Sequence, residues 1–254
     1  MSANPQATAT GTEPTLVRPG NFVAHARVVP MGNGWNWLAS AWPIFSRAAG
    51  VWIGMVVALL LIIIVAHLIP FIGAIAIQIL WPVFVGGLMI ASRTIDEGGQ
   101  ARFSQLFAGF RQRTGTLVTL GVVWLVVSFL IVAIVIGITG VSVFGLMAAN
   151  PEQVFAVAAT ALLAALLILA LMLPLVMATW FAPALIVFQG MGVAAAMKAS
   201  FIGSLKNVLP FLLYGVIAIV AGVIASLPFG LGWLVLGPVL TASVYTSYRD
   251  IYFE

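Results

Sequence analysis

The sequence predicts an all-α integral membrane protein with six transmembrane helices. Of its 254 residues, 63% are hydrophobic and only 6% are charged, which is too few to cover a water-soluble surface. Several apolar runs reach the ~20 residues that a helix needs to cross ~30 Å of hydrocarbon. These runs lack the alternation of barrel strands, and lipid offers no partner to unpaired backbone groups, so each run is expected to be a helix.

The chain is expected to hold one membrane domain after a polar tail. Residues 1–34 are small, polar and interrupted by proline and glycine, which is typical of a disordered segment, and we expect a cytoplasmic tail here. Residues 35–254 are expected to form a single six-helix transmembrane domain. The apolar runs that define the six crossings cover residues 51–69, 73–92, 116–147, 154–188, 208–227 and 231–248.

The basic residues predict how the crossings are oriented. All ten fall before the first run, between the second and third, between the fourth and fifth, or after the sixth, whereas the opposite loops carry only Glu152. Cytoplasmic loops of membrane proteins are enriched in lysine and arginine. We therefore expect a multi-pass protein with both termini in the cytoplasm.

A short amphipathic segment precedes each of the three hairpins. Its apolar residues recur on one helical face, and basic residues lie nearby, as in helices that lie in the headgroup layer. An open alternative is that these are cytoplasmic helices packed on one another. The three sets are Trp35, Leu38, Trp42 and Phe45; Phe103, Leu106, Phe107 and Phe110; and Val193, Met197, Phe201 and Leu205.

Several residues in the first third of the chain recur in the last third at a constant spacing of 156 positions. This spacing predicts parallel repeats, each of an interfacial helix followed by a hairpin. The repeats would cover about 35–96, 103–188 and 193–254. The paired residues are Phe45 with Phe201, Pro82 with Pro238 and Arg93 with Arg249. The middle copy is longer. The fourth apolar run, which belongs to this copy, would be about 52 Å long as one straight helix. This length exceeds the hydrocarbon thickness. It can be accommodated by tilt, by kinks at Pro174 and Pro183, or by a projecting 144–156 hairpin tip that meets a partner.

Candidate functional residues are few. Pro82, Pro174 and Pro238 are candidate hinges, with simple packing kinks as the alternative. The basic residues at the cytoplasmic side are candidate contacts for lipid headgroups or a partner: Arg93, Arg111, Arg113, Lys198, Lys206 and Arg249. Arg93 and Arg249, each followed by an aspartate (Asp96, Asp250), could form one symmetric site, or they could act as snorkelling anchors with local ion pairs.

The residue types that usually carry catalysis or bind cofactors are rare in this sequence. The chain has no cysteine, two histidines and six carboxylates, and it carries no phosphate-binding loop, HExxH or GxSxG motif. We expect no enzyme, no metal and no cofactor. The basic residues are too scattered for a nucleic-acid surface. The expected partner is the phospholipid bilayer, with a membrane protein partner or a homo-oligomer left open.

The chain resembles a family of small, uncharacterised bacterial inner-membrane proteins with six predicted spans. More distantly, it is similar to YciC-type proteins and to the membrane domain beside some glycerophosphodiester phosphodiesterases. The resemblance implies a bacterial inner membrane and a fold, and it brings no catalytic residues. It rests on Gly34-Trp35, Trp42 and Phe45, on Leu106 to Arg111, on Trp180 to Ala184, on Lys198 to Phe201, and on Gly237-Pro238-Val239 with Tyr245, Tyr248, Arg249 and Asp250.

Three functions fit these observations. The first is a non-enzymatic scaffold or modulator of membrane partners or lipids, and it agrees with the scarcity of intramembrane charge. The second is a permease or channel for a neutral or apolar small solute, which would need a wide polar cavity. The third is a lipid-modifying enzyme, which would need Arg93, Asp96 and Arg249 to converge within hydrogen-bonding reach.

Overall fold

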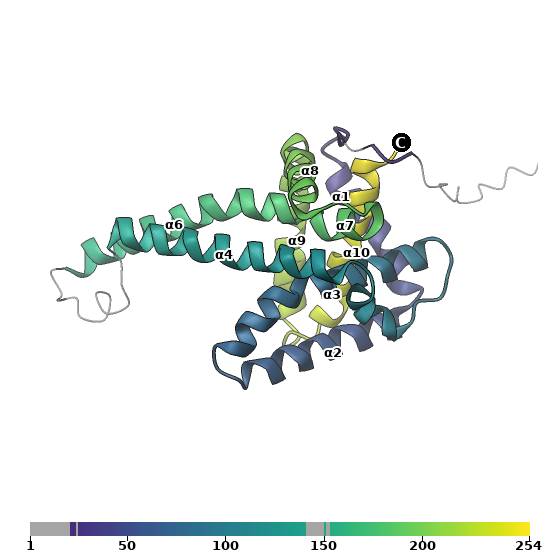
Figure 1. The fold of residues 1–254 in the computed structure, drawn as a ribbon, viewed down its shortest axis with the longest axis horizontal. Coiled ribbons are helices and arrows are strands. Elements are labelled where there is room, and N and C mark those ends of the chain that lie inside the picture. Colours follow the sequence, from purple (N-terminus) through teal and green to yellow (C-terminus); the bar gives the residue numbers. More distant parts are fainter. Residues whose placement is uncertain (1–20, 24, 141–149, 151–152) are drawn as a thin grey trace, which may run out of the picture.

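The computed structural model describes residues 21–23, 25–140, 150 and 153–254, which fold almost entirely as helices (Figure 1). In this part of the chain the only β pairing is an isolated bridge between Phe22 and Phe253. The elements are α1 (Asn33–Ser46), α2 (Ala49–His67), α3 (Ile72–Asp96), the 3-10 helix η1 (Phe103–Phe110), α4 (Thr114–Thr139), α6 (Val154–Thr179), α7 (Ala182–Gln189), α8 (Val193–Lys206), α9 (Val208–Ser226) and α10 (Trp233–Tyr252).

Five stretches are long and apolar enough to cross a membrane. They are α2, α3, α4, α9 and the stretch Val154–Gln189, which contains α6 and α7. The prediction of an all-helical, multi-pass membrane protein is thus confirmed. The sixth predicted crossing falls on α10, which is a 20-residue helix but is not among the five. Threonine, serine and tyrosine side chains in its second half, such as Ser243 and Thr246, make α10 more polar.

The core forms where α3 and α10 meet the shorter helices. α10 packs chiefly against α1 and also against α2, α3 and α9, while α3 packs against α4, η1 and α7. The largest fully buried side chains include Trp37, Trp52 and Phe181. Gly109 of η1 lies so close to the carbonyl oxygen of Val83 in α3 that a β-carbon would collide with it, so glycine permits this contact.

The predicted amphipathic faces differ from the observed ones. In α1, Leu38 and Phe45 are buried as expected, but Trp35 and Trp42 are more than half exposed, and Trp37 is buried instead. The buried face of α1 is rotated because it packs against α9 and α10. The second segment is a 3-10 helix in which only Leu106 and Gly109 are buried, and the third, α8, buries Ala196, Ser200, Gly203 and Ser204.

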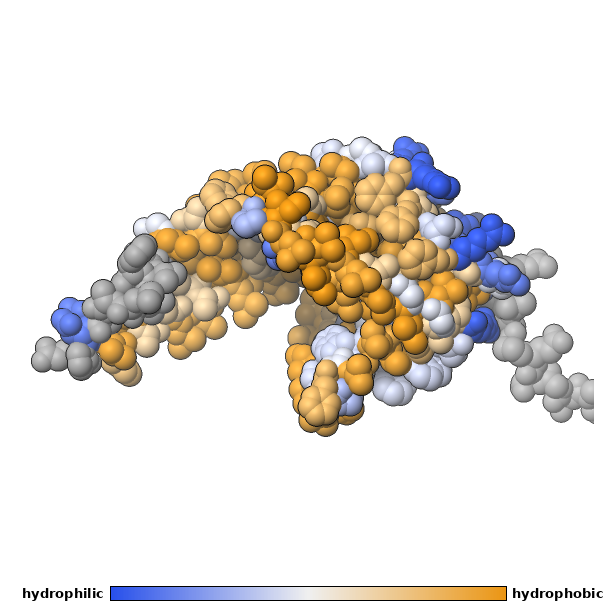
Figure 2. Space-filling view, turned by 90° about the horizontal axis from the view of Figure 1, so that it is seen from below, coloured by the Kyte–Doolittle hydropathy of each residue, from blue (hydrophilic) through white to orange (hydrophobic). Residues whose placement is uncertain are grey.

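Helices α4 and α6 form an arm that extends away from the other helices (Figure 1). Each has 26 residues, about 39 Å at 1.5 Å per residue, which exceeds the ~30 Å of hydrocarbon. Exposed apolar side chains cover the arm, among them Phe129, Ile138 and Phe155. Figure 2 shows the same arm as a largely hydrophobic surface, with most of the strongly hydrophilic side chains at the opposite end of the molecule. Most of the predicted 144–156 tip lies outside the described residues.

The fourth apolar run breaks into α6 and α7 close to Pro183, one of the two prolines at which a kink is among the alternatives for the length of this run. The backbone N–H of Phe181 donates to Ser200 Oγ at 2.9 Å, and Ser200 Oγ donates to the carbonyl of Met177 at 2.7 Å. The hydroxyl of α8 thus replaces the helical hydrogen bond between residues 181 and 177. A side chain inserted into the ladder is an established cause of a sharp kink.

Part of the predicted tail, residues 21–23 and 25–34, is ordered, which differs from the expectation of a disordered segment over residues 1–34. The backbone N–H of Val23 donates to the carbonyl of Tyr252 at 2.8 Å, and that of Arg27 donates to Ile251 at 2.8 Å. Asn207, which is 1% exposed, accepts from the N–H of Val29 and donates to the carbonyl of Arg27, both at 2.8 Å. These hydrogen bonds hold the segment against α8 and the end of α10.

Candidate binding pocket at the polar end

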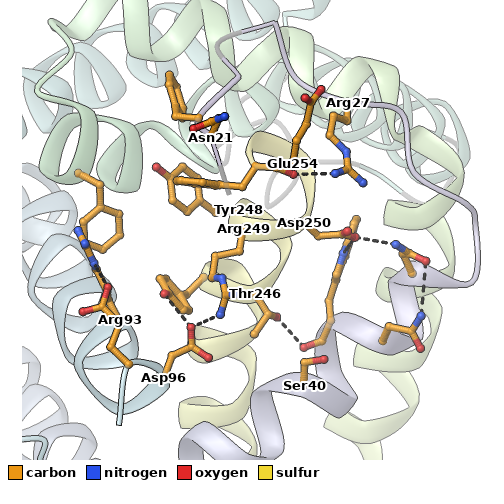
Figure 3. A pocket seen from close by; sticks show the side chains of 18 of the residues that line it. Asn21, Arg27, Ser40, Arg93, Asp96, Thr246, Tyr248, Arg249, Asp250 and Glu254 are labelled. Atoms are coloured by element: carbon orange, nitrogen blue, oxygen red, sulfur yellow. Dashed lines mark hydrogen bonds and ion pairs between the residues drawn. The ribbon is translucent and has the colours of Figure 1, made fainter. Parts of the chain in front are cut away.

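A pocket of about 830 Å³ lies at the end of the bundle where α3 and α10 finish and α1 begins (Figure 3). We call it the polar-end pocket. Helix α1 contributes Asn33, Asn36, Trp37 and Ser40, and the segment before it contributes Arg27. The last turns of α3 and α10 and the end of α7 supply the other walls. Its volume is within the range of small-molecule sites.

An ion pair between Asp96 of α3 and Arg249 of α10 occupies one wall of this pocket. Both side chains are partly exposed, at 24% and 29%, and Tyr245 donates its hydroxyl to the same oxygen of Asp96 at 3.0 Å. A lipid-modifying enzyme would need Arg93, Asp96 and Arg249 to converge within hydrogen-bonding reach, and the structure places two of them, Asp96 and Arg249, in direct contact.

Arg93 lines the same pocket but pairs locally, at the end of its own helix. Its Nε donates to Glu97, the residue that follows the end of α3, at 2.7 Å. The guanidinium lies over the ring of Phe188 from α7, with 5.2 Å between Cζ and the ring centroid. This contact and the ion pair fix Arg93 at the edge of the pocket, so a ligand there would meet a pre-oriented guanidinium.

Asp250, on the next face of α10, is held by neutral donors. Asn33 donates its amide to Asp250 at 2.7 Å, and the indole N–H of Trp37 donates at 2.8 Å. Thr246 donates its hydroxyl to the carbonyl of Trp37 at 2.7 Å, which fixes α1 to α10. Asn33 and Trp37 cannot be recognised from the sequence as partners of Asp250, because they are more than 200 residues from it and no local pattern links them.

The remaining predicted contact residues lie outside this pocket. Arg111, Arg113 and Lys198 are exposed, and the guanidinium of Arg113 lies against Gly190. Lys206 has a structural contact, because its ammonium donates to the carbonyl of His25 at 2.6 Å and of Ala26 at 3.2 Å. It therefore holds the N-terminal segment.

The three predicted hinge prolines all lie inside helices that continue through them. Pro82 is buried in α3 and Pro238 is buried in α10, whereas Pro174 is exposed in α6. The helix break that does occur lies beyond Pro174, at Trp180 and Phe181 between α6 and α7, where Ser200 of α8 supplies the hydroxyl. A second, apolar groove of about 650 Å³ lies between α9 and α10 and includes Gly222 and Trp233.

The side chains that line the polar-end pocket are suited to binding a charged ligand. Its described lining residues include three arginines and four carboxylates but no histidine. Over the residues that the structure describes, no three histidine, aspartate or glutamate side chains cluster as metal ligands do. Compared with protein-family models, with curated proteins and with solved structures, the chain gave no match.

Proposed function

We propose that the protein is a non-enzymatic protein of the bacterial inner membrane that scaffolds or modulates lipids or membrane partners through its polar end. The observation that carries this proposal is where the charges lie. In α2, α3, α4, α6 and α9, aspartate, glutamate, lysine and arginine occur only in the last turn of α3. Charges that drive transport or catalysis within a membrane normally lie in the spans.

The proposed topology has six crossings, with both termini in the cytoplasm. The 20 residues of α10 would cover about 30 Å, enough to cross the hydrocarbon. Packing against α1, α2, α3 and α9 would shield its hydroxyl groups from lipid. The polar-end pocket and the basic residues would then lie on the cytoplasmic side.

Matching helix lengths support the proposed parallel repeat. α1 and α8 both have 14 residues, and α2 and α9 both have 19. Each following turn has the sequence Pro-Phe with a positive φ at the phenylalanine, 61° at Phe71 and 53° at Phe229. A positive φ is rare for an aromatic residue, so its occurrence in both turns favours a common unit.

The alternative function is a permease or channel for a neutral or apolar solute. The open polar-end pocket favours it, since a solute could enter there. The interior favours the first function, because large apolar side chains such as Trp52, Met55 and Leu120 fill it. A lipid-modifying enzyme is less favoured because Asp96 already accepts from Arg249 and Tyr245, which leaves it a poor general base.

Purification of the full chain in a mild detergent, followed by mass spectrometry of what co-purifies, tests this proposal. We expect a reproducible, stoichiometric protein or phospholipid. A bound small solute with neither protein nor lipid would favour the permease. Release of a chemically altered lipid on incubation would contradict the non-enzymatic assignment.

A further inference from the structure

The carboxylate of Asp250 is positioned to receive a cation. Its Oδ2 accepts from Asn33 and Trp37, both of which are neutral donors. Among the described residues, no lysine, arginine or histidine forms a salt bridge with it. A carboxylate without a countercharge in a partly buried wall is an incomplete arrangement, and a primary ammonium with three N–H donors would complete it.

Two of the three arginines that line the same pocket, Arg93 and Arg249, retain donors for an anion. Arg249 bonds Asp96 through one terminal nitrogen, and Arg93 bonds Glu97 through Nε. A guanidinium has five N–H groups, so most of those on each arginine are not engaged by other described protein groups. The planar fork of N–H groups matches a phosphate, which accepts two parallel hydrogen bonds from it.

Donors for an anion and an acceptor for an ammonium thus line one pocket. Arg249 and Asp250 are consecutive on α10, and Figure 3 shows their side chains diverging, with Arg93 across the pocket from Asp250. We propose that this pocket binds a phosphoethanolamine group, with its ammonium on Asp250 and its phosphate on Arg249 and Arg93. This proposal deepens the proposed function, on which it rests, by naming the chemistry of the lipid.

The surroundings of the pocket favour a membrane lipid as the source of that group. Helix α1 lines the pocket through Asn36 and Ser40, and it exposes Trp35 and Trp42 by 57% and 54%. Tryptophan side chains are enriched at the level of lipid headgroups. The pocket of about 830 Å³ also has room for the glycerol that follows the phosphate. Free phosphoethanolamine is the other source with the same chemistry.

Native mass spectrometry of the full chain in detergent can test this proposal with lipids of equal acyl chains. The probes are phosphatidylethanolamine, phosphatidylglycerol, which lacks the amine, and phosphatidylcholine, whose quaternary amine has no N–H. We expect phosphatidylethanolamine to bind about tenfold more tightly than phosphatidylglycerol or phosphatidylcholine. A hydrogen bond to a charged group contributes about a factor of ten to affinity. Equal binding of phosphatidylglycerol and phosphatidylethanolamine would overturn the proposal.

Two substitutions in the pocket test whether the lipid preference arises there and not elsewhere on the protein. Asp250→Asn keeps an acceptor for Asn33 and Trp37 but removes the charge, and it should abolish the preference for the amine. Ser40→Trp should fill the pocket and remove binding, whereas Ala39→Trp, at the adjacent exposed position outside the pocket, should not. Unchanged lipid preference in both Asp250→Asn and Ser40→Trp would contradict the assignment.

Competition with free phosphoethanolamine identifies the source. Displacement of the lipid means that the headgroup alone is recognised, and persistence of the lipid means that its glycerol and acyl chains add affinity. Both results support the proposal. If a partner protein co-purifies but no lipid preference exists, the inference fails while the proposed function stands. If neither protein nor lipid co-purifies, the proposed function fails as well.

Discussion

Asp96 and Arg249, which are 153 positions apart, form an ion pair that joins the last turn of α3 to the last turn of α10. Tyr245 donates to the same carboxylate. Asp96→Asn should therefore lower the free energy of unfolding by about 1–3 kcal/mol, because two hydrogen bonds lose their charged acceptor. Thermal unfolding in detergent measures this change.

Glu97→Gln is the matched control for that substitution. Glu97 pairs with Arg93 at the end of one helix, where both side chains are about half exposed. An exposed pair of this kind contributes only about 0.3–0.5 kcal/mol. An equal loss of stability in both variants would contradict a specific role for the pair between α3 and α10.

Ser200→Ala should destabilise the break between α6 and α7. The substitution leaves the Phe181 N–H and the Met177 carbonyl without the hydroxyl that separates them. We expect a loss of about 1–3 kcal/mol, measured by thermal unfolding. Thr119→Ala is the control, since its exposed hydroxyl donates only to Gly115 of its own helix. A Ser200→Ala variant as stable as the wild type would show that the hydroxyl does not hold the break.

Gly121 allows α4 to approach α3 closely. A β-carbon at this position would collide with the backbone of Ile79, whereas nothing lies within 4 Å of one at Gly137 in the same helix. Gly121→Ala should lower the melting temperature, and Gly137→Ala should leave it unchanged or raise it, since alanine favours a helix by about 1 kcal/mol over glycine. The opposite order would mean that α3 and α4 do not pack in this way.

Asn207→Ala should release the segment before α1. Its side chain accepts from the N–H of Val29 and donates to the carbonyl of Arg27, so the variant leaves both backbone groups unpaired. We expect trypsin to cleave after Arg27 at least several-fold faster. Asn36→Ala, which removes only an exposed contact to Asn33, should cleave at the wild-type rate. Equal rates in all three proteins would contradict this anchoring role.

The sequence predicts the helices well because length and composition alone determine them in lipid. The predicted runs at 51–69 and 208–227 differ from α2 and α9 by two residues or fewer at each end. The break in the fourth run lies just before Pro183, so of the alternatives for this long run, which include tilt and kinks at Pro174 and Pro183, the kink at Pro183 agrees with the structure, since proline lacks an N–H. The hydroxyl that completes the break comes from Ser200 on another helix, and no local pattern identifies it.

Long-range contacts limit what the sequence predicts elsewhere. The face of α1 was predicted from the spacing of its apolar residues, but tertiary packing buries Trp37 and exposes Trp35. Small polar residues predicted disorder up to residue 34, yet backbone hydrogen bonds to α10 order part of that segment. In the pocket, paired charges indicate Arg93, Asp96, Arg249 and Asp250, whereas the neutral donors to Asp250 emerge only from the fold.

In the proposed topology, the polar-end pocket faces the cytoplasm, and Asn150, which precedes α6, faces the opposite side of the membrane. The chain has no cysteine, so single cysteines introduced at Gln112, Asn150 and Glu254 can be labelled in intact cells without background. We predict that a membrane-impermeant maleimide labels Asn150→Cys, and labels Gln112→Cys and Glu254→Cys only after the membrane is opened. Labelling of Gln112→Cys and Glu254→Cys from opposite sides would contradict the account.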